Sequence, residues 1–199
     1  MRHPATRLAI APLLLLCAAV AVRAADAPAP ARYVLDPAKS TLEFTFTQAG
    51  AQNKGRFRHF QTQFDFAPDN LSASRLEVSI EVASLDTGDE ERDATLRDAE
   101  LFAAQKFPQA RFSASQIVKT ASGYEAVGKL TIRDVSREIH LPFTFRPATE
   151  AGASVGYMSG KTQLRRLDYG VGQGDWKATD QVPNEVGVAF ALRLSSAVR

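Results

Sequence analysis

Residues 86–112 read DTGDEERDATLRDAELFAAQKFPQARF, and they form the one helical stretch in a sequence that otherwise alternates like β-strands. Thr87 and Glu90 are spaced as in a capping box, in which each side chain bonds the backbone amide of the other residue. We therefore predict that a helix starts here. Pro108 disfavours helical geometry at the residue before it, so we predict that this helix ends near Lys106.

A narrow apolar stripe runs along one side of this predicted helix. Its members recur at helical spacing, and charged residues occupy the opposite side. They are Leu96, Ala99, Phe102 and Ala103. A single helix that lays a phenylalanine against a sheet suggests a lid or plug, and we expect Phe102 to help close one end of the fold.

The rest of the chain shows the period-two alternation of half-buried strands. Residues 75–84 are the clearest case, because Leu76, Val78 and Ile80 alternate with polar side chains. Comparable segments occupy residues 41–47, 55–66, 111–119, 124–132, 137–147, 155–166 and 185–195. Short turns join most of them, and the segments on either side of Gly123 are predicted to form a hairpin.

This pattern predicts an all-β fold, namely an eight-stranded antiparallel lipocalin-like barrel with one short helical segment between strands. A closed barrel removes exposed strand edges. A barrel of this size is either filled by side chains or holds one small ligand. All twelve phenylalanines lie between residues 44 and 190, mostly on apolar registers. Core packing and cavity lining are both consistent with that distribution.

The start of the chain has the pattern of a secretory signal peptide. Two arginines precede an apolar block at residues 8–22, and Ala24 fits a cleavage site. The block is shorter than the roughly 20 residues needed to span a membrane, which disfavours a membrane anchor. We predict a signal peptide at residues 1–24, a flexible tether at 25–31 and one barrel domain at 32–196, with export to the periplasm.

Composition after residue 24 excludes several classes of protein. The remaining 175 residues carry 21 basic and 22 acidic side chains. Nucleic-acid binding needs a clustered basic excess, so we predict no nucleic-acid partner. Cys17 is the only cysteine and lies in the predicted signal peptide. Disulfides, thiol catalysis and cysteine metal sites are therefore not expected in the mature protein.

Motifs that carry chemistry are missing from the mature sequence. Its only histidines are His59 and His140, and it has neither an H-E-x-x-H zinc motif nor a G-x-S-x-G nucleophile elbow. The carboxylates at residues 86–93 do not match a calcium loop, and the electrostatics of a helix start explain them. We predict no catalytic residue, no metal and no cofactor.

Two groups of cationic residues leave two interpretations open. Arg56 lies between Lys54 and Arg58, and Arg165 precedes Arg166. Each group is either a solvated face or a contact for a phosphate or polar head at a barrel mouth.

Several short motifs occur in the order and spacing of one known family. They are Y-x-L-D-P-x-x-S at 33–40, S-L-D-T-G at 84–88, L-F-x-x-x-x-F-P-x-A-x-F at 101–112, G-x-L-T-I at 128–132 and R-L-D-Y-G-V-G-Q-G-D-W at 166–176. From about Tyr33 to Leu194 the chain resembles the YceI-like family of periplasmic, lipocalin-like polyisoprenoid-binding proteins. The last motif is similar to that of a branch of this family whose members sometimes occur alongside cytochrome b561-type membrane proteins.

The resemblance implies a barrel that carries or stores a long prenyl chain, such as a polyprenyl lipid or an isoprenoid quinone, without chemistry. Strand register then selects the predicted lining, with Arg56 or Arg166 near the head group. The predicted lining residues are Phe44, Phe46, Phe102, Phe112, Leu130, Phe143 and Phe190. An enzyme acting on the bound lipid, an accessory partner of a cytochrome b561-type membrane protein, and a homodimer remain open alternatives.

Overall fold

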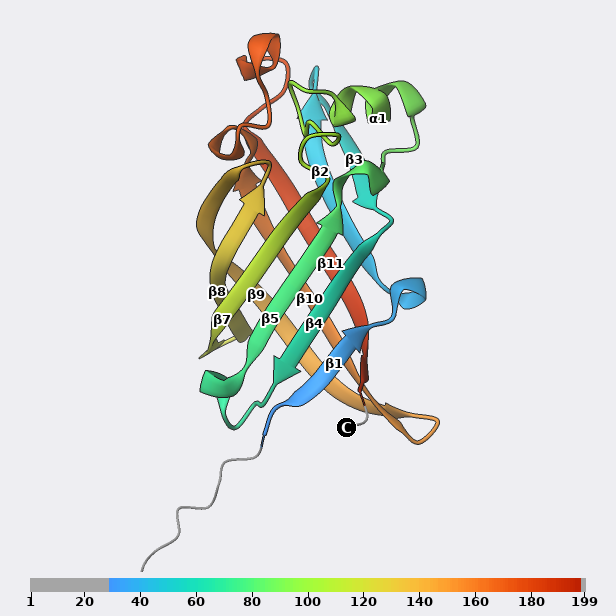
Figure 1. Ribbon diagram of the computed structural model, residues 1–199, viewed down its shortest axis with the longest axis vertical. Coiled ribbons are helices and arrows are strands. Elements are labelled where there is room, and N and C mark those ends of the chain that lie inside the picture. The colour runs from blue at the N-terminus through green and yellow to red at the C-terminus, as the bar shows by residue number, and fades with distance from the viewer. Residues whose placement is uncertain (1–28, 198–199) are drawn as a thin grey trace, which may run out of the picture.

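Eight strands with alternating apolar residues close into one antiparallel barrel (Figure 1). The structure is a computed structural model and describes residues 29–197. The ring runs β1–β4–β5–β7–β8–β9–β10–β11 and returns to β1. Its strands are β1 (Ala31–Leu35), β4 (Phe60–Phe66), β5 (Arg75–Glu81), β7 (Gln109–Thr120), β8 (Gly123–Ile132), β9 (Val135–Glu150), β10 (Ala153–Arg165) and β11 (Glu185–Ser196). The predicted fold class and the β7–β8 hairpin are confirmed.

Three further strands extend the wall at one end of this ring. They are β2 (Thr41–Gln48), β3 (Ala51–Phe57) and β6 (Leu85–Asp86). β2 pairs with β11 on one side and β3 on the other, so it continues the position of β1 after the break at Pro37. The turn between β2 and β3 is limited to Ala49 and Gly50, so β3 begins earlier than the strand segment predicted at 55–66.

The helix differs from its prediction at both ends. α1 spans only Glu90–Arg97, and its N-cap is Asp89, whose carboxylate accepts a hydrogen bond from the Arg92 amide at 3.0 Å. Thr87 instead donates its hydroxyl hydrogen to the Asp93 carboxylate, at 2.7 Å. The helix ends because Asp98 takes an extended conformation (φ −64°, ψ 164°). Phe102 therefore lies on a turn segment after the helix.

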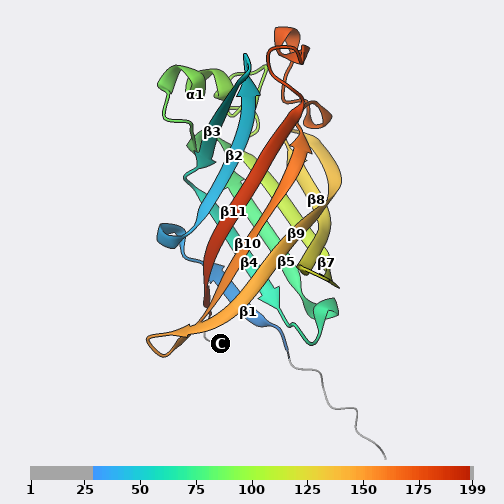
Figure 2. The same ribbon diagram turned by 180° about the vertical axis from the view of Figure 1, so that it is seen from behind.

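The two ends of the barrel carry different appendages. α1 and the loop between β10 and β11 lie together at one end, and the β9–β10 hairpin extends past the other end, as Figure 2 shows from behind. The predicted signal peptide lies outside the described residues. Of the predicted tether only residues 29–31 are described, and Ala31 already belongs to β1. Among residues 29–197 there is no helix with the length and apolarity needed to cross a membrane.

Candidate ligand-binding site

The half of the barrel next to α1 contains a cavity of about 460 Å³. Inward-facing residues of most strands line it, because each strand places every second side chain inside. On β11 these are Val186, Val188, Phe190 and Leu192. The volume lies within the roughly 300–1,000 Å³ that is usual for small-molecule sites. The cavity is therefore large enough for a ligand and is lined mostly by apolar side chains.

The other half of the barrel is filled. Six aromatic side chains interlock there, namely Tyr33, Phe64, Phe66, Tyr124, Phe143 and Phe145. We call these residues the aromatic cluster. The ring centroids of Phe64 and Phe66 are 4.7 Å apart, and those of Phe66 and Phe145 are 4.9 Å apart. Phe64 is 0 % exposed. This cluster forms the closed end beneath the cavity.

The floor of the cavity can be followed strand by strand. On β4, Phe60 and Thr62 line the cavity, whereas Phe64 belongs to the aromatic cluster. On β9 the lining stops at Leu141, and the next inward residue, Phe143, belongs to the cluster. The boundary thus crosses the barrel at Thr62 and Leu141.

The mouth of the cavity is covered by segments that are bonded to one another. The amides of Gly172 and Gln173, in the loop between β10 and β11, donate to the Glu100 carbonyl at 3.0 and 2.7 Å. The Ala49 amide donates to the Gln181 carbonyl of the same loop at 2.8 Å. The side of α1 that faces the cavity presents Asp89, Arg92, Thr95 and Leu96. The mouth therefore combines apolar side chains with charged ones.

The side chain of Arg166 is hydrogen-bonded to the backbone of this loop. Its side chain is buried (6 % exposed), and its five N–H groups donate to five backbone carbonyls at 2.7–3.2 Å. The acceptors are Val171, Trp176, Ala178, Val182 and Pro183. Burial lowers the pKa of the guanidinium from its ordinary value. No N–H group of Arg166 is left for a ligand head group.

Gly172 makes room for that arrangement. Its φ is +123°, a conformation that favours glycine, and a Cβ there would collide with Arg166 Nη1. Gly172 thus serves the packing around Arg166.

The structure brings most of the predicted lining residues together. Those that line the cavity are Phe44, Phe46, Phe102, Phe112, Leu130, Phe190 and Arg166. Phe143 does not, because its ring packs in the aromatic cluster, 5.5 Å from Tyr124 and 5.8 Å from Phe64 between centroids. Phe143 is therefore not part of the candidate site. Whether the others contact a ligand stays a prediction.

Arg56 faces away from the cavity. Its neighbours Gly55 and Phe57 occupy the inward register of β3, and Arg56 donates to the Asp86 carboxylate at 2.9 Å. Arg58 reaches the same carboxylate at 2.8 Å. The hydrogen bond from Arg56 is the main cause that lowers the pKa of Asp86. Arg56 is therefore a surface ion-pair partner, which corrects its predicted place near a head group.

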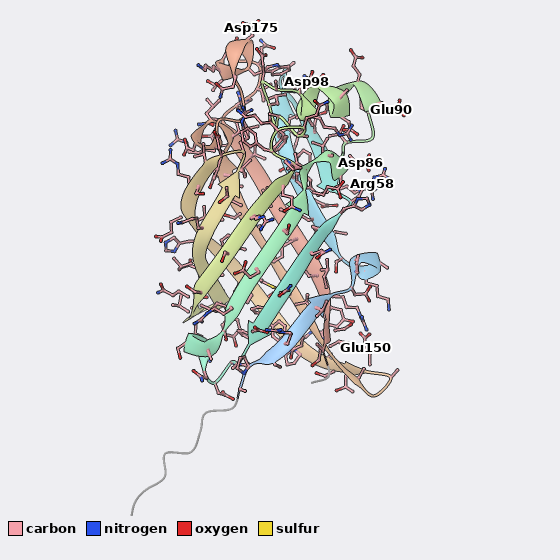
Figure 3. The ribbon with its side chains drawn as sticks, viewed as in Figure 1. Arg58, Asp86, Glu90, Asp98, Glu150 and Asp175 are labelled. Carbon is pink, nitrogen blue, oxygen red and sulfur yellow. The ribbon has the colours of Figure 1, made fainter. Side chains whose placement is uncertain are left out.

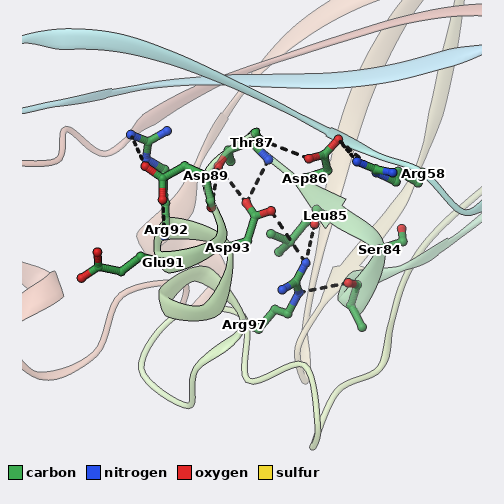
Figure 4. A network of polar contacts seen from close by, with 12 residues as sticks. Arg58, Ser84, Leu85, Asp86, Thr87, Asp89, Glu91, Arg92, Asp93 and Arg97 are labelled. Carbon is green, nitrogen blue, oxygen red and sulfur yellow. Dashed lines mark hydrogen bonds and ion pairs between the residues drawn. The ribbon is translucent and has the colours of Figure 1, made fainter.

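Two acidic residues at the start of α1, Asp89 and Asp93, are bonded to neighbouring groups of the chain. Figure 4 shows Asp89 bonded to Arg92, and Asp93 bonded to Thr87. Asp93 is only 7 % exposed and also lies 3.9 Å from Arg97. In the part of the chain that the structure describes, no group of three or more His, Cys, Asp or Glu residues could hold a metal ion. Figure 3 shows Glu90, Asp98 and Asp175 at the mouth end, and Glu150 at the opposite end.

Arg92 and Thr62 are among the polar lining residues that were not predicted from the sequence. Arg92 lies on the side of α1 that faces the mouth, a position that depends on where the helix begins. Thr62 lies in the cavity wall. A signal for Thr62 was present, since it is the polar member of the inward series Phe60, Thr62, Phe64, Phe66.

Comparison with known proteins places the chain in a family. Residues 33–194 match the YceI-like domain. A UPF0312 protein of Vibrio cholerae is 31 % identical over 148 residues, which cover 71 % of this chain and 78 % of that protein.

Solved structures agree with this match. BcnA of Burkholderia cenocepacia superimposes with a TM-score of 0.73 at 32 % identity, covering 80 % of this chain and 98 % of BcnA. A polyisoprenoid binding domain from Saccharophagus degradans shares the fold, with a TM-score of 0.63 at 14 % identity over 84 % of this chain and 99 % of that one. The chain therefore belongs to the family of YceI-like domain proteins.

Proposed function

We propose that this protein binds an isoprenoid lipid, a polyprenyl chain or an isoprenoid quinone, inside the barrel and carries or stores it in the periplasm. The observation that supports this most is the cavity of about 460 Å³, apolar along its walls, closed at one end by the aromatic cluster and covered at the other. A relative of the same fold is described as a polyisoprenoid binding domain.

The energetics of such a site favour retention of a long hydrocarbon. Each methylene group that leaves water for an apolar environment contributes about 0.8 kcal/mol. Several prenyl units therefore outweigh the cost of ordering the ligand. A lipid of this kind could not cross an aqueous compartment unshielded, so a barrel with a covered mouth suits a carrier or store. The proposal is for binding, with no reaction.

Native mass spectrometry of the gently purified protein tests this function. We expect an isoprenoid lipid to co-purify with the wild-type protein. Val188→Trp should remove it, because Val188 lines the cavity and the indole would fill the space. Ala189→Trp is the matched control, since Ala189 is the next residue of β11 and is exposed on the outer face. Wild-type preparations that are repeatedly empty, or equal lipid content in both variants, would contradict the proposal.

The remaining expectations about partners stay predictions. A cytochrome b561-type membrane partner would be detected by co-purification from membranes, and a homodimer by the mass of the native protein. Turnover of an added isoprenoid lipid by the isolated protein would favour the alternative of an enzyme.

A further inference from the structure

One buried hydroxyl in the cavity wall has no partner. Thr62 is 2 % exposed, and its Oγ1 forms no hydrogen bond with any of the residues that the structure describes. Buried polar atoms are nearly always hydrogen-bonded, because burial without a partner costs free energy. An unpaired hydroxyl in a ligand cavity therefore points to a group that is supplied by the ligand.

Thr62 belongs to the inner part of the cavity wall. Thr62 is the last residue of β4 that lines it, and Phe64, the next inward residue, is part of the aromatic cluster. The residue paired with Thr62 on β5 is Val78. Leu76 and Met158, which line the cavity near its floor, are apolar as well and offer no partner.

The charges at the cavity are concentrated at its mouth. Asp89, Glu91 and Arg92 are at the start of α1, and the N–H groups of Arg166 are all used by backbone carbonyls. A phosphate at the floor would be buried without a cation, which is strongly unfavourable. A neutral hydroxyl, by contrast, donates to a carbonyl oxygen or accepts from an alcohol.

We propose that Thr62 binds a neutral carbonyl or hydroxyl at the inner end of the lipid, so that the ligand lies with its polar end at the floor and its hydrocarbon tail toward the mouth. The inference rests on the proposed function. It selects quinone-like or alcohol-like isoprenoids over phosphorylated ones for this orientation. It also assigns Thr62 as a specificity-determining residue.

The test uses two probes of the same chain length, geranylgeraniol and its saturated hydrocarbon phytane, which has no polar atom. Thr62→Val preserves the shape of the side chain and removes the hydroxyl. We expect it to weaken geranylgeraniol binding roughly tenfold, the equivalent of about 1.4 kcal/mol, and to change phytane binding less than about twofold. Thr162→Val is the control, because Thr162 also lines the cavity, from β10.

The outcomes separate the two proposals. If the wild-type protein binds neither probe, the lipid-binding function fails. If it binds both and Thr62→Val changes both equally or neither, the inference about Thr62 is overturned while the function stands. The same holds if Thr162→Val has an effect as large as Thr62→Val, because the loss would then not depend on the floor. Geranylgeranyl phosphate that binds as tightly as geranylgeraniol, with the same loss in Thr62→Val, would also overturn it.

Discussion

The two halves of the barrel are built from the same strands and differ in how those strands are filled. In the closed half, rings of Phe64 and Phe66 on β4 stack at 4.7 Å and meet the rings of β8 and β9. In the hollow half, β4 contributes Thr62, and β11 contributes the small side chains of Val186 and Val188. The volume that the aromatic cluster occupies on one side of the boundary is left open on the other.

The strands also pair differently in the two halves. β9 and β10 are joined from Glu150 to Thr144, and the pairing stops two residues before Pro142, which has no N–H to donate. From there toward the mouth, β9 pairs with β8 and β10 pairs with β11. Apolar alternation thus decides which side chains face inward, whereas side-chain size decides whether the interior is solid or hollow. Stability should therefore reside mainly in the closed half.

The largest expected effect tests that assignment of stability. Phe64→Ala should lower the free energy of unfolding by about 3–5 kcal/mol, because Phe64 is fully buried and contacts several other rings. Phe46→Ala in the hollow half should cost only about 1–2 kcal/mol, since Phe46 is half-buried and lines the cavity. Urea denaturation measures both. Equal losses would mean that the two halves are packed alike.

A smaller effect asks whether the cover of the hollow half depends on one side chain. Arg166→Met should cost about 2–4 kcal/mol, because five backbone carbonyls lose their donors and only some of them can reach water. Hydrogen exchange of the Gly172 and Gln173 amides should rise with it. Arg165→Met is the control, because Arg165 is exposed and its ion pair with Asp168 is long, at 3.9 Å. It should change stability by less than about 0.5 kcal/mol. Similar effects of the two substitutions would show that the carbonyl contacts do not order the loop.

The smallest effect concerns the outer wall at the boundary between the halves. His140 on β9 and Glu125 on β8 form a hydrogen bond of 2.8 Å, which raises the pKa of His140 above its ordinary value. Protonated His140 is thus favoured by folding. Its contribution is complete below the unfolded pKa of about 6.5 and is lost as the pH rises through the higher folded pKa.

Glu125→Gln should remove this dependence. The variant should lose more stability, relative to the wild type, near about pH 6 than near about pH 9, and an NMR titration should place the pKa of His140 closer to about 6.5. Because the side chains are exposed, we expect a small difference. An unchanged pKa of His140 in the variant would show that Glu125 is not the cause.

Strand register was predictable from the sequence to a useful degree. Phe44, Phe112 and Leu130 were assigned to the interior from alternation alone, and they line the cavity. Position along the barrel axis was not predictable, because it depends on the stagger of all the strand pairings. Phe143 faces inward as expected but lies below the floor, in the aromatic cluster.

The differences near the mouth have local causes. The helix was predicted to reach Lys106, yet the extended conformation of Asp98 ends it at Arg97, and Leu101 is buried on the following turns. The outward direction of Arg56 could have been predicted, since Gly55 and Phe57 mark the inward register of that strand. Arg92 could not have been placed without knowing the first residue of the helix.

The hydrogen bonds between Arg166 and the five backbone carbonyls of the loop between β10 and β11 do not depend on pH in the acidic range. Surface ion pairs such as Arg58 with Asp86 dissociate once the carboxylate is protonated. A guanidinium stays charged at any ordinary pH, and backbone carbonyls do not titrate. The contacts of Arg166 with Val171, Trp176 and Val182 therefore contain no group that becomes protonated on acidification. Acidification alone would therefore leave these contacts of the loop intact.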